Sequence, residues 1–248
     1  MQYLITGIET HPDFGFGITA EAYRASANLL SDHKAQILSF QQAEMPINFL
    51  YRHSIELFIK SLIIIMHKAL KIPYGEKSFD SEKPMIIINE EWKDLFSCHW
   101  IDDLYVYWLE HLLIKNVDQL SRIAPNGDWL EEKTITNLLP IITKYDRDTS
   151  FFRYPITKST QSLDKEKYTM QPLSKESLAG MPFSIPVPKG NTKKGGVYLL
   201  CKDENDQVVR GYQKNDEILT EVNDALHRVS EYLSCIHIMS RCTLFNGH

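Results

Sequence analysis

The longest run of helical hydrophobic spacing in the chain extends from Pro46 to Leu70. Proline suits a first helical turn, where its missing amide hydrogen loses no bond, and Pro73 with Gly75 stops the helix beyond Leu70. Apolar side chains cover most of its circumference: Ile47, Leu50, Tyr51, Ile55, Leu57, Phe58, Leu62, Ile63, Ile64, Ile65 and Met66. The pattern predicts a helix of about seven turns that lies inside a bundle.

Weaker helical spacing predicts the remaining helices of the chain. Their ranges are 19–30 with an extension towards 42, 92–123, 129–145 with a kink or break at Pro140, and about 216–241. Thr19 is the expected cap of the first of these helices. The short apolar stretch 85–88 is expected to be a strand or a buried loop segment.

The chain changes character after the fourth helix. Residues 146–155, DRDTSFFRYP, mix charges with aromatic side chains and predict an ordered loop that docks a charged pair. Helical spacing then disappears over 158–196, where prolines and glycines predict a long mobile loop that limited proteolysis cuts first. The stretches 197–201 and 207–212 predict a small hairpin.

Together these elements predict a mainly α protein, an up-and-down helical bundle with a long loop and a small β-hairpin inserted before the last helix. The expected division is a bundle core over 1–155, the loop and hairpin insertion over 156–215, and a C-terminal helix over 216–248 that packs back on the bundle. With 248 residues and 43% hydrophobic side chains, the chain can bury a large core.

Composition narrows the functional classes. A net charge of −5 argues against a protein that coats nucleic acid non-specifically, because such binding needs many phosphates to be neutralised. The four cysteines form no CxxC pair and no secretory leader is evident, so a reducing cytoplasm is the expected location. The apolar run 57–70 contains charges and is too short for a membrane span, so no membrane association is expected.

The central helix carries charges through its apolar middle. Arg52, Glu56 and Lys60 stand four residues apart, which places them on one stripe of the helix, with His53 and His67 close to it. Two interpretations stay open. The stripe is either a binding site for a polar ligand or a ladder of satisfied opposite charges within the helix.

Most catalytic and metal-binding motifs are missing. The chain has no HExxH, GxSxG, Walker or kinase motif, and the spacing of Cys235, His237 and Cys242 is irregular, so neither a metal nor a cofactor is expected. The Gly15-Phe16-Gly17 sequence resembles half of a phosphate-binding loop, but the third glycine is absent and a structural turn is the expected role. Asp102 and Asp103 are expected to be charges at a helix N-terminus.

The order of NFLYRHSIELFIKSLI, SCHWIDDLYVYW and DRDTSFFRYP resembles the HEPN superfamily of small helical bundles, over about residues 19–155 plus the last helix. The resemblance implies a dimeric protein from a defence or toxin-antitoxin system. Many members are metal-independent ribonucleases whose motif is an arginine, four to six residues and then a histidine. The expectation is that this chain lacks the motif, because the nearest pairings, Arg52-His53 and His227-Arg228, are adjacent, and this favours a non-catalytic member.

Three functional hypotheses follow from the sequence. The first is an interaction or regulatory protein that forms a homodimer or docks a protein partner, with the 158–196 loop and the hairpin as its recognition insertion. The second is a ribonuclease with a displaced active site, in which Arg153 or Arg52 holds phosphate and His53 or His99 moves the proton. The third treats the stripe of Arg52, Glu56 and Lys60 as a pocket for a nucleotide or another small anion.

One expected contact links distant parts of the chain. Glu56 lies where the helix is otherwise apolar, so its charge needs a strong partner, and the planar arginine fork matches a carboxylate. The sequence therefore predicts an ion pair between Glu56 and Arg153 of the DRDTSFFRYP segment.

Overall fold

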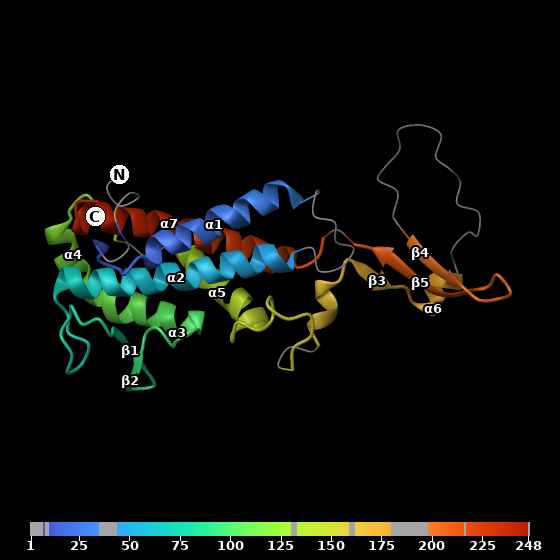
Figure 1. Ribbon diagram of the computed structural model, residues 1–248, viewed down its shortest axis with the longest axis horizontal. Coiled ribbons are helices and arrows are strands. Elements are labelled where there is room, and N and C mark those ends of the chain that lie inside the picture. Colours follow the sequence, from blue (N-terminus) through green and yellow to red (C-terminus); the bar gives the residue numbers. More distant parts are fainter. Residues whose placement is uncertain are drawn as a thin grey trace.

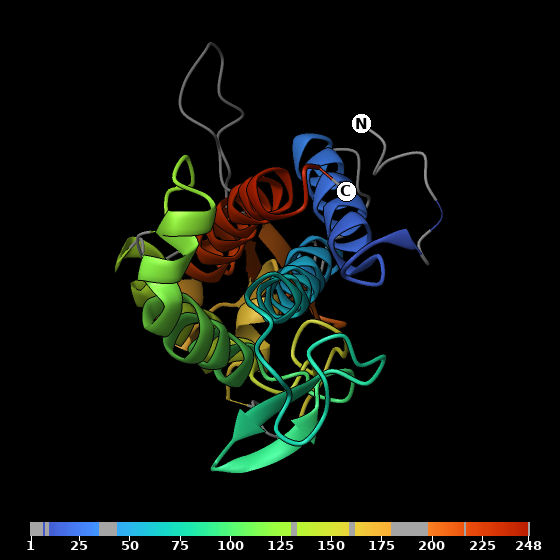
Figure 2. The same ribbon diagram turned by 90° about the vertical axis from the view of Figure 1, so that its left-hand side faces the viewer.

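The computed structural model describes residues 7, 10–34, 44–129, 133–158, 162–179, 198–215 and 217–247. It is mainly α: long helices lie side by side in a bundle, and a three-stranded sheet extends beyond one end of it (Figure 1). The main helices are α1 (Phe16–Asp32), α2 (Met45–Leu70), α5 (Lys133–Asp146) and α7 (Thr220–Leu244). Viewed along the bundle, α2 lies between α1, α7 and the green helices of the middle of the chain (Figure 2).

Helix α2 confirms the strongest sequence prediction. It begins within one residue of Pro46 and ends at Leu70, where Lys71 adopts the left-handed conformation that terminates the helix. Most of its residues are buried, because α1 packs on one side of it and α7 on another. The apolar core extends from α2 to Trp108 and to Phe151, both fully buried.

The first residues of the helix predicted over 92–123 are not helical in the structure. Residues 91–94 form strand β2 (Glu91–Asp94), which pairs antiparallel with β1 (Met85–Ile88). Helical structure begins at α3 (Ile101–Val106) and continues through a π-helical segment, η4 (Tyr107–Leu113), a 3₁₀ turn, η5 (Ile114–Asn116), and α4 (Val117–Ile123). The apolar stretch 85–88, predicted to be either a strand or a buried loop segment, is a strand.

The β1–β2 connection also breaks the expected up-and-down order. His99, just before α3, contacts Glu56 near the middle of α2, whereas Tyr107 beyond α3 contacts His67 near the end of α2. Helices α2 and α3 therefore run parallel, because the hairpin and the loop after it carry the chain back along α2. The hairpin lies on the outside of the bundle, below α3 in Figure 1.

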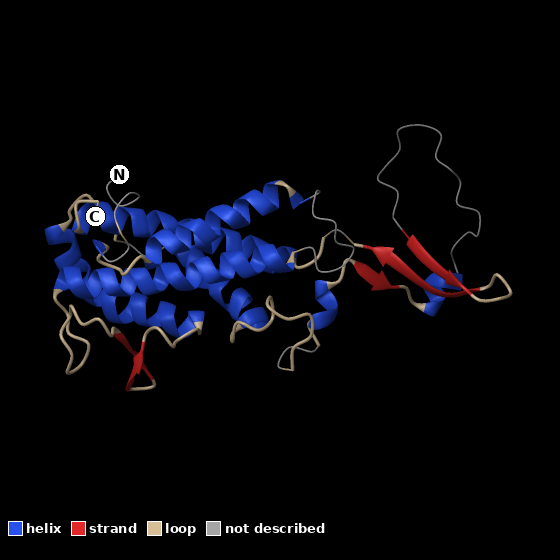
Figure 3. Ribbon diagram, in the orientation of Figure 1, coloured by secondary structure: helices blue, strands red, loops and turns tan. Residues whose placement is uncertain are grey.

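The insertion before the last helix contains more structure than a loop and a hairpin. Strands β4 (Tyr198–Lys202) and β5 (Val208–Lys214) form the predicted hairpin, and β3 (Met170–Pro172) pairs with the other edge of β5 (Figure 3). A 3₁₀ turn, η6 (Asp164–Lys167), and a short helix, α6 (Lys175–Ala179), lie within the predicted loop. Residues 159–161 and 180–196 of that loop lie outside the described ranges, so its predicted mobility is not tested.

The other helices agree with the sequence pattern except at their ends. Helix α1 begins at Phe16 rather than after Thr19, and the predicted extension over 35–42 lies outside the described residues. Helix α5 keeps Pro140 inside one continuous helix. Helix α7 begins at Thr220 and ends at Leu244, a few residues later than predicted.

Candidate functional site

The charged stripe of α2 is sealed inside the protein. Arg52, Glu56 and Lys60 are only 1%, 2% and 2% exposed. Arg52 Nη1 donates to Glu56 Oε2 at 2.6 Å, and Lys60 Nζ donates to Glu56 Oε1 at 2.9 Å. Both bonds join residues four apart on the helix, so the stripe is a continuous ladder of opposite charges, here called the α2 ladder.

The α2 ladder also holds two other segments of the chain against α2. Lys60 Nζ donates to the Phe96 carbonyl at 3.2 Å, and the Arg52 guanidinium donates to the His99 carbonyl. Arg52 Nε lies 3.2 Å from Asp146 Oδ2, and the other Asp146 oxygen accepts the amide hydrogen of Phe151. The buried cations are thereby used to fix the loop before α3 and the turn after α5.

Electrostatics keep the Glu56 carboxyl ionised. Burial on its own raises its pKa, but the charges of Lys60 and Arg52 outweigh that effect and hold the pKa below its ordinary value. At Asp146 burial dominates, so the pKa is raised despite the nearby Arg52. Arg52 and Lys60 thus share Glu56 as a counter-charge, and Asp146 is a second acid beside Arg52.

His99 connects the α2 ladder to the surface. Its Nδ1 lies 2.9 Å from Glu56 Oε1, and its side chain is 56% exposed. An ionised carboxylate only accepts hydrogen bonds, so His99 Nδ1 carries a proton and donates it to Glu56. A pocket of about 280 Å³ lies beside His99. Of the predicted site residues on or near the ladder, His99 is therefore the one placed to act on a molecule from solvent.

The predicted ion pair between Arg153 and Glu56 is wrong. Arg153 is exposed and lies over the ring of Phe49, 5.7 Å from its centroid. Glu56 is already bound by Arg52, Lys60 and His99, and the docking charge of the DRDTSFFRYP segment is Asp146. The segment does dock a charge on α2, but with the sign opposite to that predicted.

The structure does bring Arg153 close to His53. The ring of Phe49, over which Arg153 lies, stacks with His53 at a centroid distance of 6.0 Å, and Tyr23 contacts His53 edge-on. Burial lowers the pKa of His53, which favours its neutral form. These two predicted catalytic residues therefore share a neighbourhood at the surface of α2.

A second buried charge cluster surrounds Asp13. Its carboxylate accepts the amide hydrogens of Gly15 and Gly17 and the hydroxyl of Ser61. Burial raises its pKa, but hydrogen bonds from His237 and Ser61 lower it well below the ordinary range. The turn predicted for Gly15-Phe16-Gly17 is confirmed only at Gly15, because α1 begins at Phe16. An acid of the same chain, Asp13, accepts the amide hydrogens that a phosphate would take at a helix N-terminus.

One candidate motif was missed in the interpretation of the sequence. Arg241 is followed by six residues and then His248, the spacing of the HEPN nuclease motif, so the expectation that the chain lacks this motif is wrong. Counting past the end of the last predicted helix would have found it. Arg241 is 3% exposed and lies 3.5 Å from Asp13 Oδ1, while His248 is outside the described residues.

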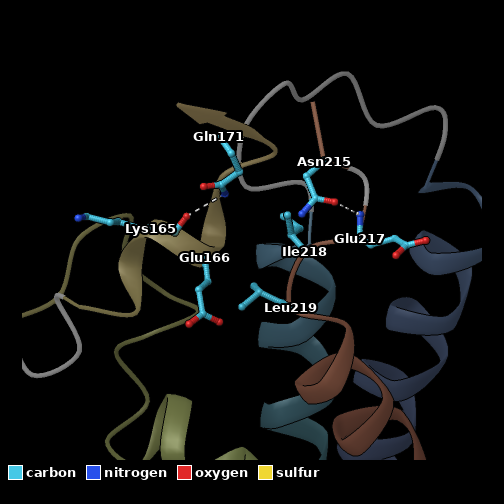
Figure 4. Close-up of a pocket in the computed structure, with 7 residues that line it drawn as sticks. All are labelled: Lys165, Glu166, Gln171, Asn215, Glu217, Ile218 and Leu219. Atoms are coloured by element: carbon cyan, nitrogen blue, oxygen red, sulfur yellow. Dashed lines mark hydrogen bonds between the residues drawn. The ribbon is translucent and has the colours of Figure 1, made fainter. Parts of the chain in front are cut away.

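Another pocket, of about 290 Å³, lies where the sheet joins α7 (Figure 4). Its polar lining groups bond within the chain: Gln171 Nε2 donates to the Lys165 carbonyl, and Asn215 Oδ1 accepts from the Glu217 amide. Glu166, also in its lining, accepts a hydrogen bond from Tyr145. None of the predicted site residues lines this pocket.

Comparisons of the chain with protein-family models, curated protein sequences and solved structures give no significant match. In the described ranges, no group of three or more histidine, cysteine, aspartate or glutamate side chains is placed to hold a metal ion. Among the helices that the structure describes, none combines the length and the apolar character needed to cross a membrane.

Proposed function

We propose that this protein is a HEPN-like interaction protein that acts by binding rather than by catalysis, as a homodimer or with a protein partner. Its setting is the cytoplasm, in a prokaryotic defence or toxin-antitoxin system. The family assignment rests on the sequence resemblance and is compatible with a mainly α fold. The binding role rests on the state of the charged side chains.

One observation carries this proposal: two arginines that could hold a substrate phosphate, Arg52 and Arg241, are closed off from solvent, and the exposed Arg153 lies over the ring of Phe49. Arg52 is held by Glu56, Asp146 and the His99 carbonyl, and Arg241 lies against Asp13. Withdrawing one partner from such a buried pair costs about 3–5 kcal/mol. The binding of a phosphate to either arginine would have to offset that cost. We therefore assign these charges a structural role.

The homodimer is tested by multi-angle light scattering over a wide range of protein concentrations. The expected mass is twice the 28.8 kDa of the chain. A mass of one chain at every concentration contradicts the homodimer and leaves a different protein as the partner.

The second candidate function is a metal-independent ribonuclease, and two observations favour it. Arg241 and His248 have the spacing of the nuclease motif. His99 is an exposed imidazole oriented by the buried Glu56 carboxylate, the arrangement of a general base. Each observation is tested by a different variant. If the motif forms the active site, His248→Ala abolishes RNA cleavage. If the His99 imidazole bonded to Glu56 is the general base, His99→Ala abolishes it.

A further inference from the structure

The β1–β2 hairpin borders two adjacent pockets, which we call the hairpin groove. One pocket, of about 280 Å³, is lined by Asp94, Asp148, Trp100 and His99. The other, of about 260 Å³, is lined by Glu90, Asp103, Val106 and Tyr107. Ile88 belongs to both, which makes the two pockets neighbours on either side of the end of β1.

Local backbone geometry fixes the shape of the groove. Asn89 and Glu90 connect the strands in two residues with φ of 52° and 66°, the geometry of a tight primed hairpin turn. On the other side, Lys60 and Arg52 hold the carbonyls of Phe96 and His99 on α2. Both walls are therefore set by the fold of the free protein.

The charge of the groove is negative. Asp94 and Asp148 face one pocket and Glu90 and Asp103 the other, whereas Lys93 is the one lysine or arginine in the described lining. Arg147, nearby, lies 3.5 Å from Asp102 and over the ring of Trp100. Burial and the charge of Asp102 raise the pKa of Asp103, as expected where carboxylates outnumber cations. Such a field repels phosphate and attracts cations.

The apolar surface around the groove suits a protein partner. Trp92, Phe96 and Trp100 are 38%, 39% and 42% exposed, large aromatic areas at or near the hairpin. Exposed aromatic side chains beside carboxylates match lysine and arginine, whose apolar stems pack on rings while their charged ends meet acids. Aromatic residues also supply much of the binding energy in protein interfaces.

We propose that the hairpin groove binds a basic segment of a partner protein, with lysine or arginine side chains entering the two pockets. This inference rests on the proposed interaction function and specifies the chemistry of the partner. Recognition combines charge attraction at the four carboxylates with packing on Trp100, which lines one pocket and is 42% exposed.

The test uses a fluorescein-labelled hexa-arginine peptide and measures fluorescence anisotropy with the full-length protein. The test variant is Asp94→Asn with Asp148→Asn. Asparagine keeps the oxygen that accepts the amide hydrogens of Phe96 and Ser150, so the two turns are retained. The control is Glu204→Gln with Glu221→Gln, which removes the same two charges from exposed positions outside the groove.

Binding is expected to weaken by about tenfold in the test variant, because each exposed ion pair contributes a few-fold in affinity. It is expected to be unchanged in the control and to weaken with added salt. Equal binding of the peptide by the wild type, the test variant and the control variant overturns the proposed role of the groove. Failure of the wild type to bind the peptide at low salt overturns it as well. A single-stranded RNA, labelled and measured in place of the peptide, overturns it in favour of a nucleic-acid site if its binding changes in the test variant but not in the control. None of these results bears on whether the wild type cleaves RNA, which is the result that would overturn the proposed function, so a wrong groove is distinguishable from a wrong proposed function.

Discussion

Replacing Glu56 with glutamine removes the central charge of the α2 ladder and leaves its shape nearly unchanged. Glutamine and glutamate have similar helix propensities, so the helix itself loses little. The amide nitrogen of glutamine, however, is a donor that would face the donors of Arg52 or Lys60. If the amide nitrogen faces Lys60, the ammonium keeps the Phe96 carbonyl as its acceptor, because its other bond is to Glu56.

The expected loss follows from the burial of the cluster. Leaving one charge of a buried pair without its partner costs about 3–5 kcal/mol, and Asp146 still partners Arg52, so the lower end of that range applies. A loss of about 3 kcal/mol lowers the melting temperature of a protein of this size by about 6–12 °C. The double variant Glu56→Leu with Lys60→Met removes one charge of each sign and is expected to lose less.

Urea and thermal unfolding followed by circular dichroism measure these losses. The exposed Glu221→Gln variant is the matched control and is expected to change stability by less than about 0.5 kcal/mol. Two results would refute the reasoning. One is a loss below about 1 kcal/mol for Glu56→Gln, which would mean that the α2 ladder is hydrated. The other is a double variant whose loss equals the sum of the losses of Glu56→Leu and Lys60→Met.

Three further predictions concern other buried groups. Burial lowers the pKa of His67 to about 4 from an ordinary 6.5, so the unfolded chain takes up the proton at a higher pH than the folded protein. The free energy of unfolding therefore falls as pH decreases from 6.5 to 4, by about 3 kcal/mol in all. His67→Phe should flatten the pH dependence of stability in that range. Gly17→Ala should destabilise by about 1–3 kcal/mol in urea unfolding, because its Cβ would clash with the His237 ring; an unchanged midpoint contradicts that contact. Lys167→Met should raise amide hydrogen exchange around Asp164, since buried Lys167 bonds that carboxylate at 2.7 Å; unaltered exchange would show that the ion pair does not hold the segment.

The sequence predicts well where local signals agree. Helix α2 has a proline at its start, a proline and a glycine after its end, and apolar residues on all sides, and its bounds are right within one residue. Residues 92–94 are assigned to a helix from the sequence but belong to strand β2, because their backbone pairs with β1, a contact that the spacing of apolar residues does not reveal.

The candidate site shows the same limit. The four-residue spacing placed Arg52, Glu56 and Lys60 on one stripe, and this is confirmed because the spacing is a property of one helix. Which charge of the DRDTSFFRYP segment reaches that stripe depends on where α5 ends. Asp146 is its last residue and is positioned by the helix, whereas Arg153 lies beyond a turn and points to Phe49.

Incubation with total RNA in the presence of a metal chelator tests the central claim, that this protein acts by binding rather than by catalysis. The wild type and the His248→Ala and His99→Ala variants are compared at high protein concentration, after their melting temperatures are shown to agree. The account predicts intact RNA in all three. Cleavage by the wild type that is lost in either variant would contradict it and would identify the protein as a ribonuclease.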